Sequence, residues 1–243
     1  MFKHNPKNYL LLRKLARFGF LLPLVWGLLA CTGAGQRAVL DVPAEFVDIK
    51  SLIPTLVLDV RYASSDNFVG QPITGYQAEK IYLTRAAAAA LASVQAELAA
   101  KGMGLKLFDG YRPQRAVDHF VRWAQDLDDT RMQEKYYPAV VKQNLFSEGY
   151  IAERSGHTRG STVDLTIVEL PSNKELDMGG PWDFFDPISW PSSTAVSEEQ
   201  FANRMLLQDV MQRHGFRPLD TEWWHFTLQG ETFPDRYFDF VIR

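Results

Sequence analysis

Two short polar segments, far apart in the chain, most restrict the folds open to this sequence. The first runs from Ser155 through His157 to Asp164, and the second is Glu222-Trp-Trp-His225. A catalytic zinc site uses three His, Asp or Glu ligands and leaves a fourth position for water. A further carboxylate then takes the proton from that water. The three ligands can be His157, Asp164 and His225, and the carboxylate that takes the proton can be Glu222. A fold that supports this chemistry must therefore bring both segments together.

A plainer interpretation of these residues stays open at this point. A single buried His beside a Trp is usually a hydrogen-bonded core residue, and short patterns such as H-x6-D and E-x-x-H occur by chance. The chain has only five His, and both candidates lie in Gly- or Trp-rich contexts typical of strand ends, where sites are usually built. The residues alone therefore support metal binding and core packing about equally.

Strand geometry gives a test of the metal interpretation. His157 and Asp164 are seven residues apart, so on one straight strand they would face opposite ways. A turn or bulge at Arg159-Gly160-Ser161 can bring both to one side. Glu222 and His225, three apart, meet the same objection unless Glu222 still belongs to the preceding loop. The ligand set therefore requires two backbone irregularities.

The first 31 residues are typical of a bacterial lipoprotein signal. Five basic and no acidic residues accompany an apolar run from Phe18 to Ala30 that ends at Leu28-Leu-Ala-Cys31. The run is shorter than the about 20 apolar residues of a spanning helix, so it fits a cleaved export signal. Cys31 is the only cysteine and cannot form an internal disulfide. We predict that it is the lipidated first residue of the mature protein; a plain secretory signal with an incidental Cys is the alternative.

This signal predicts an exported protein that a lipid anchor at Cys31 holds in the bacterial cell envelope, on the periplasmic side. Thr32 at the next position favours the outer membrane in a host that has one. The chain has 26 basic and 29 acidic side chains, and loss of the signal brings the net charge to about −8. With no basic patch, nucleic acid is not an expected partner.

The rest of the chain predicts one domain of the α+β class. Residues 32–45 are small and polar and indicate a tether, and residues 46–243 suffice for one hydrophobic core. The strands are expected at 55–62, 105–108, 161–168 and 223–228. A first helix is expected at 84–101, capped by Thr84. A second is expected from Pro113 onward, with an apolar face made of Val117, Phe120, Val121 and Ala124. A third is expected from Ser197 to Gly215, with a capping box completed by Gln200. The order predicts a central, mostly antiparallel sheet flanked by helices, and residues 171–191 form a long functional loop.

These motifs together resemble the zinc D-Ala-D-Ala dipeptidases of the VanX type, which share a fold with zinc D,D-carboxypeptidases and the Hedgehog signalling domain. The resemblance spans about residues 46–230. It rests on Ser155-x-His-x-x-Gly-Ser-x-x-Asp164 and Glu222-x-Trp-His225, and on further landmarks in family order. Those landmarks are Asp59-Val-Arg-Tyr-Ala63, Asp66-Asn-Phe68, Gly75-Tyr76, Phe108-Asp-Gly-Tyr-Arg-Pro-Gln-Arg115 and Leu176-Asp-Met-Gly179.

The resemblance implies a catalytic centre with one zinc ion per chain. His157, Asp164 and His225 would bind the zinc, and Glu222 would be the general base. Arg112 would stabilise the oxyanion, which agrees with the several kcal/mol that a fixed cation contributes beside developing negative charge. The alternative for such an Arg is a surface salt bridge at the start of a helix, which Arg115 fits better.

The resemblance also implies a set of residues that hold the dipeptide. Tyr62, Tyr76 and Ser155 match positions near its ends, with Ser155 and Tyr76 suited to the carboxylate. Asp183 matches the acid that pairs with the free ammonium and so rejects longer peptides. Without the family, Asp183 is equally well an ordinary loop acid, and Asp177 and Asp186 are its neighbours of the same type.

The expected function is therefore that of a zinc metallopeptidase that hydrolyses D-Ala-D-Ala to two D-Ala. An exported enzyme cannot deplete a cytoplasmic dipeptide pool, so the expected role is salvage or turnover of cell-wall dipeptide. One alternative is a zinc D,D-carboxypeptidase acting on peptidoglycan stem peptides, which the role of Asp183 would distinguish. Another is a non-catalytic, zinc-stabilised binding module, although a structural zinc needs neither Glu222 nor Arg112.

Overall fold

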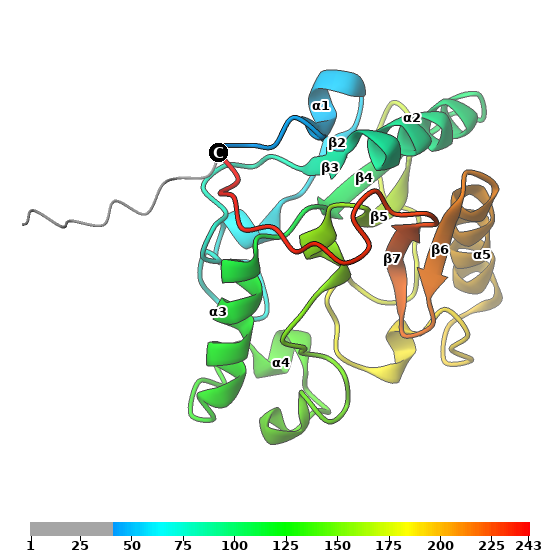
Figure 1. Cartoon of the computed structure of the whole chain (residues 1–243). Coiled ribbons are helices and arrows are strands. Elements are labelled where there is room, and N and C mark those ends of the chain that lie inside the picture. The colour runs from blue at the N-terminus through cyan, green and yellow to red at the C-terminus, as the bar shows by residue number, and fades with distance from the viewer. Residues whose placement is uncertain (1–40) are drawn as a thin grey trace, which may run out of the picture. The chain divides into compact units, whose positions relative to one another are not determined.

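The computed structural model describes residues 41–243, and the predicted signal at 1–31 with its lipidation site Cys31 lies outside the described residues, as does the tether up to residue 40. Within the described part, a five-stranded sheet has the order β2-β4-β5-β7-β6 (Figure 1). These strands are β2 (Val57–Leu58), β4 (Met103–Asp109), β5 (Thr162–Glu169), β7 (Glu222–Leu228) and β6 (Phe216–Leu219). Only the β2–β4 pair is parallel, so the prediction of a mostly antiparallel α+β fold is confirmed.

A small antiparallel ribbon and a helical turn precede the main sheet along the chain. The ribbon pairs β1 (Phe46–Asp48) with β3 (Tyr82–Thr84), and α1 (Ile49–Leu52) follows β1 directly. Phe46 packs its ring edge against Tyr111, with the ring centroids 5.2 Å apart. The ribbon thereby closes one side of the aromatic core.

Two long helices pack beside each other along the main sheet, where Figure 1 shows them on the same side of the molecule. The first, α2 (Arg85–Ala99), follows Thr84, whose hydroxyl accepts a hydrogen bond from the Ala87 amide. The second, α5 (Glu198–Arg213), begins with the predicted capping box between Ser197 and Gln200. Both cap predictions are confirmed, because each rests on local hydrogen bonds that the sequence specifies.

Two further helices lie on the opposite side of the molecule from α2 and α5 (Figure 1). They are α3 (Gln114–Gln125) and the short α4 (Gln133–Tyr136), with a 3₁₀ turn η2 (Lys142–Asn144) after them. As predicted, α3 begins after Pro113. Of its predicted apolar face, Val117, Phe120 and Ala124 are buried and Val121 is half-buried. No helix among residues 41–243 is both long and apolar enough to cross a membrane.

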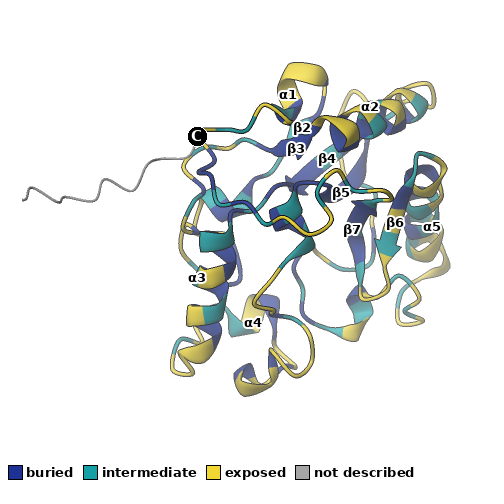
Figure 2. Ribbon diagram, viewed as in Figure 1, coloured by how far each residue is buried: buried dark blue, intermediate teal, exposed yellow. Residues whose placement is uncertain are grey.

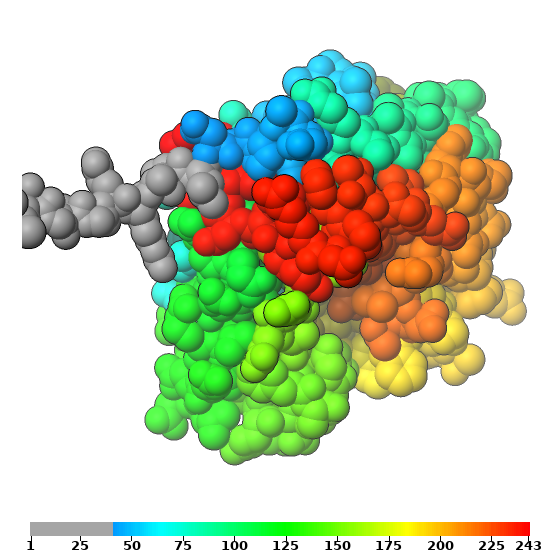
Figure 3. All heavy atoms as spheres, in the orientation of Figure 1, coloured from blue at the N-terminus to red at the C-terminus, as the bar shows by residue number. Residues whose placement is uncertain are grey.

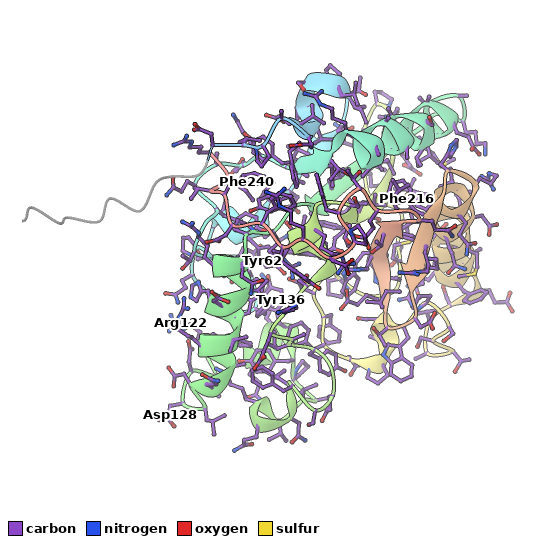
Figure 4. The ribbon with its side chains drawn as sticks, viewed as in Figure 1. Tyr62, Arg122, Asp128, Tyr136, Phe216 and Phe240 are labelled. Atoms are coloured by element: carbon purple, nitrogen blue, oxygen red, sulfur yellow. The ribbon has the colours of Figure 1, made fainter. Side chains whose placement is uncertain are left out.

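The strand predicted at 55–62 is wrong over most of its length. Only Val57 and Leu58 pair with β4, and the chain then turns into the 3₁₀ helix η1 (Arg61–Ala63). The turn directs Tyr62 into the interior between α3 and the sheet (Figure 4), where its ring lies 5.2 Å from Phe120 and 5.0 Å from Trp182. Burial of this ring outweighs the strand propensity of the segment.

The central strands are buried on both faces (Figure 2). In β5 the predicted polar face, Thr162, Asp164 and Thr166, is as buried as the apolar face. The Thr162 hydroxyl is hydrogen-bonded to that of Thr227 on β7 at 2.9 Å. A strand with two buried faces and a carboxylate on one of them is the main support of the site described below.

The C-terminal segment runs across one face of the molecule between the N-terminal ribbon and α3 (Figure 3). Its Phe240 ring stacks on Tyr111 with the centroids 3.9 Å apart, and Tyr111 donates a hydrogen bond to the Phe240 carbonyl. Ile242 bridges to Tyr76 in parallel orientation. The segment thus fastens both loops that lead to the site residues Tyr76 and Arg112.

Gly160 generates a testable prediction about this fold. Its φ is +82°, and a Cβ at this position would overlap the Phe46 ring. We expect Gly160→Ala to lower the free energy of unfolding by about 3 kcal/mol, from left-handed strain plus overpacking. Gly102→Ala is the matched control, because Gly102 has φ +73° but nothing within 4 Å of a Cβ, and should lose only about 1 kcal/mol. Equal losses in urea unfolding would show that the Phe46 contact is unimportant.

Candidate metal centre

The first pair of predicted ligands is brought together by a tight turn. Ser155 caps the 3₁₀ helix η3 (Gly156–Arg159), which carries His157 and ends at Gly160 in the left-handed conformation. Because Gly160 adopts a positive φ without steric cost, the chain reverses there before β5 begins. His157 and Asp164 thus face the same point, and the turn predicted at 159–161 is confirmed.

The second pair depends on a bulge between β6 and β7. Asp164 lies opposite His225 in the β5–β7 ladder. On the other edge of β7, Pro218 pairs with Phe226 while the next residue, Leu219, pairs with Glu222. Glu222 is therefore the first residue of β7, and the prediction that it belongs to the preceding loop is wrong. The bulge supplies the backbone irregularity that the ligand set requires. One carboxylate oxygen of Glu222 reaches within 3.4 Å of His225 Nδ1.

Three donor atoms converge at this point as a metal site requires. His157 Nε2, His225 Nδ1 and Asp164 Oδ1 are each 3.2 Å from the other two. Ligands about 2.0 Å from a tetrahedral zinc ion lie about 3.3 Å apart, so the triangle has the right size. Asp164 Oδ1 is fully buried and accepts no hydrogen bond from residues 41–243. A buried carboxylate oxygen without a partner is costly, and a cation at the centre of the triangle would satisfy it.

The surrounding groups fix the orientation of the ligands. His157 Nδ1 lies 2.8 Å from the Gly110 carbonyl, which accepts its proton and leaves Nε2 free for a metal. Trp182 Nε1 donates to the second oxygen of Asp164 at 3.3 Å. Burial alone would favour neutral Asp164, but the two imidazoles outweigh it and hold the pKa of Asp164 below its usual range. The carboxylate is thus ionised and ready to bind a cation.

His225 lies against two carboxylates, those of Asp164 and Glu222. Burial lowers the pKa of His225, but the adjacent carboxylates of Asp164 and Glu222 outweigh this and raise it to about 9. A metal ion at the triangle would have to displace that proton, since only a neutral imidazole nitrogen binds a metal. Metal binding and proton release are therefore coupled at this residue.

A half-buried cation, Arg112, lies next to the three ligand atoms. A bulge at the end of β4 places Asp109 opposite Asp164, and Asp109 accepts a hydrogen bond from Arg112 Nε at 2.9 Å. Arg112 Nη2 lies 3.8 Å from the Asp164 carboxylate. By contrast, Arg115 forms an ion pair with Asp239 away from the site, as its position at the helix start predicted. Arg112 is thus a fixed positive charge beside the three ligand atoms.

The hydroxyl of Tyr76 points to this buried pair. It donates a 2.7 Å hydrogen bond to Asp109, and Tyr76 does not line the adjacent cavity. Of the predicted substrate-holding residues, Tyr76 is therefore the one that the structure does not bring to the cavity wall. It supports Arg112 from behind, through Asp109.

Asp183 and Tyr62 form the other buried pair of the site. The Tyr62 hydroxyl donates to the Asp183 carboxylate at 2.7 Å. Asp183 has φ +60°, which is uncommon for a residue other than glycine and is often found at functional sites. Burial raises the pKa of Asp183 well above its usual range. Its loop neighbours Asp177 and Asp186 instead accept hydrogen bonds from local backbone amides.

The loop that carries Asp183 is fastened by a buried arginine. Arg204 on α5 donates to the carbonyls of Met178, Ile188 and Trp190 at 2.6–2.9 Å. These carbonyls lie on both sides of Asp183 in the chain. Arg204 therefore fixes both ends of the segment that presents this acid.

The predicted metal-binding, catalytic and substrate-holding residues other than Tyr76 meet in one cavity of about 280 Å³. The predicted site residues that line it are Tyr62, Arg112, Ser155, His157, Asp164, Asp183, Glu222 and His225. Asp109 was assigned no role from the sequence, although it stands three residues before Arg112 at the end of a strand, a spacing that favours an ion pair. Arg154, which lines the same cavity, was also assigned no role.

Comparison with known proteins agrees with this site. The peptidase family M15, described as D-ala-D-ala dipeptidase, matches residues 43–243. A D-alanyl-D-alanine dipeptidase of Streptomyces coelicolor is 44% identical over 82% of this chain and 98% of its own length. Proteins with the same name from Enterococcus faecalis and Enterococcus faecium are 40% and 36% identical over 81% and 82% of this chain, and over 98% of their own lengths.

Two solved structures are more distant. The vancomycin resistance D,D-pentapeptidase VanY, in complex with Zn(II), aligns at 16% identity with a TM-score of 0.37, over 61% of this chain and 74% of its own. The LdcB LD-carboxypeptidase aligns at 18% with a TM-score of 0.40, over 78% and 70%. The sequence matches extend over nearly all of residues 41–243 and include both segments that carry the candidate ligands. The chain therefore belongs to the D-Ala-D-Ala dipeptidase family of M15 peptidases.

Proposed function

We propose that this zinc metallopeptidase hydrolyses D-Ala-D-Ala to two D-alanines, with one zinc ion bound by His157, Asp164 and His225. The observation that carries the proposal is a single small cavity that joins the three ligand atoms to the buried acid Asp183. Its volume of about 280 Å³ lies at the lower limit of small-molecule pockets. A short substrate with a free ammonium fits such a site.

The chain's own residues then divide the work of peptide hydrolysis. A bound zinc ion would polarise the scissile carbonyl and acidify the attacking water. Glu222, 3.4 Å from a ligand nitrogen, is placed to take the proton from that water and to deliver it to the leaving amine. Arg112, held by Asp109, stabilises the negative charge that develops on the carbonyl oxygen.

Substrate selection follows from the buried acid at the far end of the cavity. An ammonium near Asp183 would favour the ionised carboxylate, which burial alone disfavours. A peptide extended at its N-terminus has an amide there and cannot replace the ammonium charge. The Tyr62 hydroxyl holds Asp183 in place, and Ser155 is suited to the substrate's carboxylate end. This supports a dipeptidase over a D,D-carboxypeptidase that trims stem peptides.

We further propose that the enzyme acts outside the cytoplasm in salvage or turnover of cell-wall dipeptide, anchored through a lipid on Cys31. The support is the sequence pattern of residues 1–31. Mass spectrometry of the protein from its native membranes should give a mature N-terminus at Cys31 that carries a lipid, and Cys31→Ser should abolish lipidation. Recovery of the uncleaved chain, beginning at Met1 in the cytosol, would overturn this location.

The assignment of the general base predicts that binding and turnover can be separated. Glu222→Gln keeps the size of the side chain but removes the basic carboxylate, so we expect kcat to fall by about 10²–10⁴-fold. Zinc should remain bound at one per chain, measured by atomic absorption after dialysis. Asp220→Asn in the same β6–β7 turn is the matched control and should keep full activity. A fully active Glu222→Gln would show that another group takes the proton.

The ammonium anchor predicts the substrate preference. Released D-Ala should be detected from D-Ala-D-Ala and not from a pentapeptide ending in D-Ala-D-Ala. Asp183→Asn should lower kcat/KM for the dipeptide about 100-fold, as loss of one buried charged pair does, and relax the preference for it. Asp186→Asn, whose side-chain oxygen can still accept from the Ile188 amide, is the control. Efficient cleavage of the pentapeptide by the wild type would identify a carboxypeptidase instead.

A further inference from the structure

The cavity has a second cation, Arg154, that the proposed mechanism does not use. Two arginines line the cavity, Arg112 and Arg154. Arg112 is neutralised by Asp109, whereas Arg154 is exposed and forms no hydrogen bond or ion pair with any side chain of residues 41–243. A cation in the wall of a substrate cavity with no protein carboxylate beside it is available to a ligand.

The position of Arg154 is set by an aromatic ring. Its guanidinium lies 5.0 Å from the centroid of the Tyr237 ring. This cation–π contact uses none of the guanidinium's N–H groups in a hydrogen bond, because no side-chain hydrogen bond of Arg154 is present among residues 41–243. Those N–H groups match a carboxylate, which arginine binds with two parallel hydrogen bonds. Tyr237 therefore orients Arg154 without satisfying its charge.

The charges of the cavity wall show which ligand group Arg154 would bind. Asp183, Glu222 and Asp164 are acidic, but the zinc ion of the proposed function and Arg112, which Asp109 holds, offset them at the reaction centre. Ser155, next to Arg154 in the chain, offers only a neutral hydroxyl. Arg154 is therefore the cation of the cavity wall that is left for the carboxylate of a zwitterionic dipeptide.

We propose that Arg154 binds the C-terminal carboxylate of the substrate, beside Ser155, and so sets the specificity of the site for a free C-terminus. This inference rests on the proposed function. The dipeptide is then held by a charge at each end, with Asp183 on its ammonium and Arg154 on its carboxylate. The scissile bond is fixed between them, beside the three ligand atoms and Glu222.

The test compares two substrates that differ only in this charge, D-Ala-D-Ala and D-Ala-D-alaninamide. With the zinc-loaded enzyme, Arg154→Gln should raise KM for the dipeptide about tenfold and change kcat less than about twofold, because a partly exposed charged hydrogen bond is lost. The same substitution should leave KM for the amide unchanged. If the amide is hydrolysed too slowly for KM to be measured, its inhibition constant as a competitor of the dipeptide should be unchanged instead. Arg154→Lys should restore most of the affinity for the dipeptide through its remaining charge.

Arg236→Gln is the matched control, because Arg236 also stacks on an aromatic ring, 4.5 Å from the centroid of Phe238, but does not line the cavity. It should behave as the wild type on both substrates. Equal losses on dipeptide and amide in Arg154→Gln, or no loss on either, would overturn the role of Arg154 while the dipeptidase activity stands. A zinc-loaded wild type inactive on D-Ala-D-Ala would instead overturn the proposed function, and this inference with it.

Discussion

The buried carboxylate of Asp164, placed between two imidazoles, is the interaction on which the site depends. Removing a carboxylate from water is costly unless partners surround it, and here His157, His225 and Trp182 do so. Their positions require the turn at Gly160 and the pairing of β5 with β7. One oxygen has no hydrogen-bond donor among residues 41–243, and a cation held by the three ligand atoms would satisfy it.

Two buried aspartates in one cavity have opposite properties because their neighbours differ. Asp164 lies between two imidazoles whose effect outweighs its burial, and its pKa is lowered. Asp183 has mainly a phenol beside it, so burial dominates and its pKa is raised. The first is thus a permanent anion suited to a metal ion, and the second becomes an anion when a ligand brings a positive charge. An ammonium is the ligand that gains from this difference.

The sequence predicted those features that local chemistry decides. The helix caps at Thr84 and Ser197 follow from side-chain hydrogen bonds within a few residues, and the turn at Gly160 follows from the spacing of His157 and Asp164. The bulge that opens β7 at Glu222 depends on how β6 pairs with it, which no local pattern encodes. The inward turn of Tyr62 likewise depends on Asp183, far along the chain. Tertiary pairing, not propensity, decides both.

The support of Arg112 explains why Tyr76 belongs to the site without lining the cavity. A cation that stabilises an oxyanion is effective only if it does not have to reorient during the reaction. Asp109 holds the guanidinium of Arg112, and Tyr76 and the Gly110 amide hold Asp109 in turn. Ile242 of the C-terminal segment, itself buried, bridges to Tyr76 and so extends this support to that segment. The position of Arg112, the cation to which we assign the oxyanion, is therefore fixed by a chain of contacts that reaches the C-terminal segment.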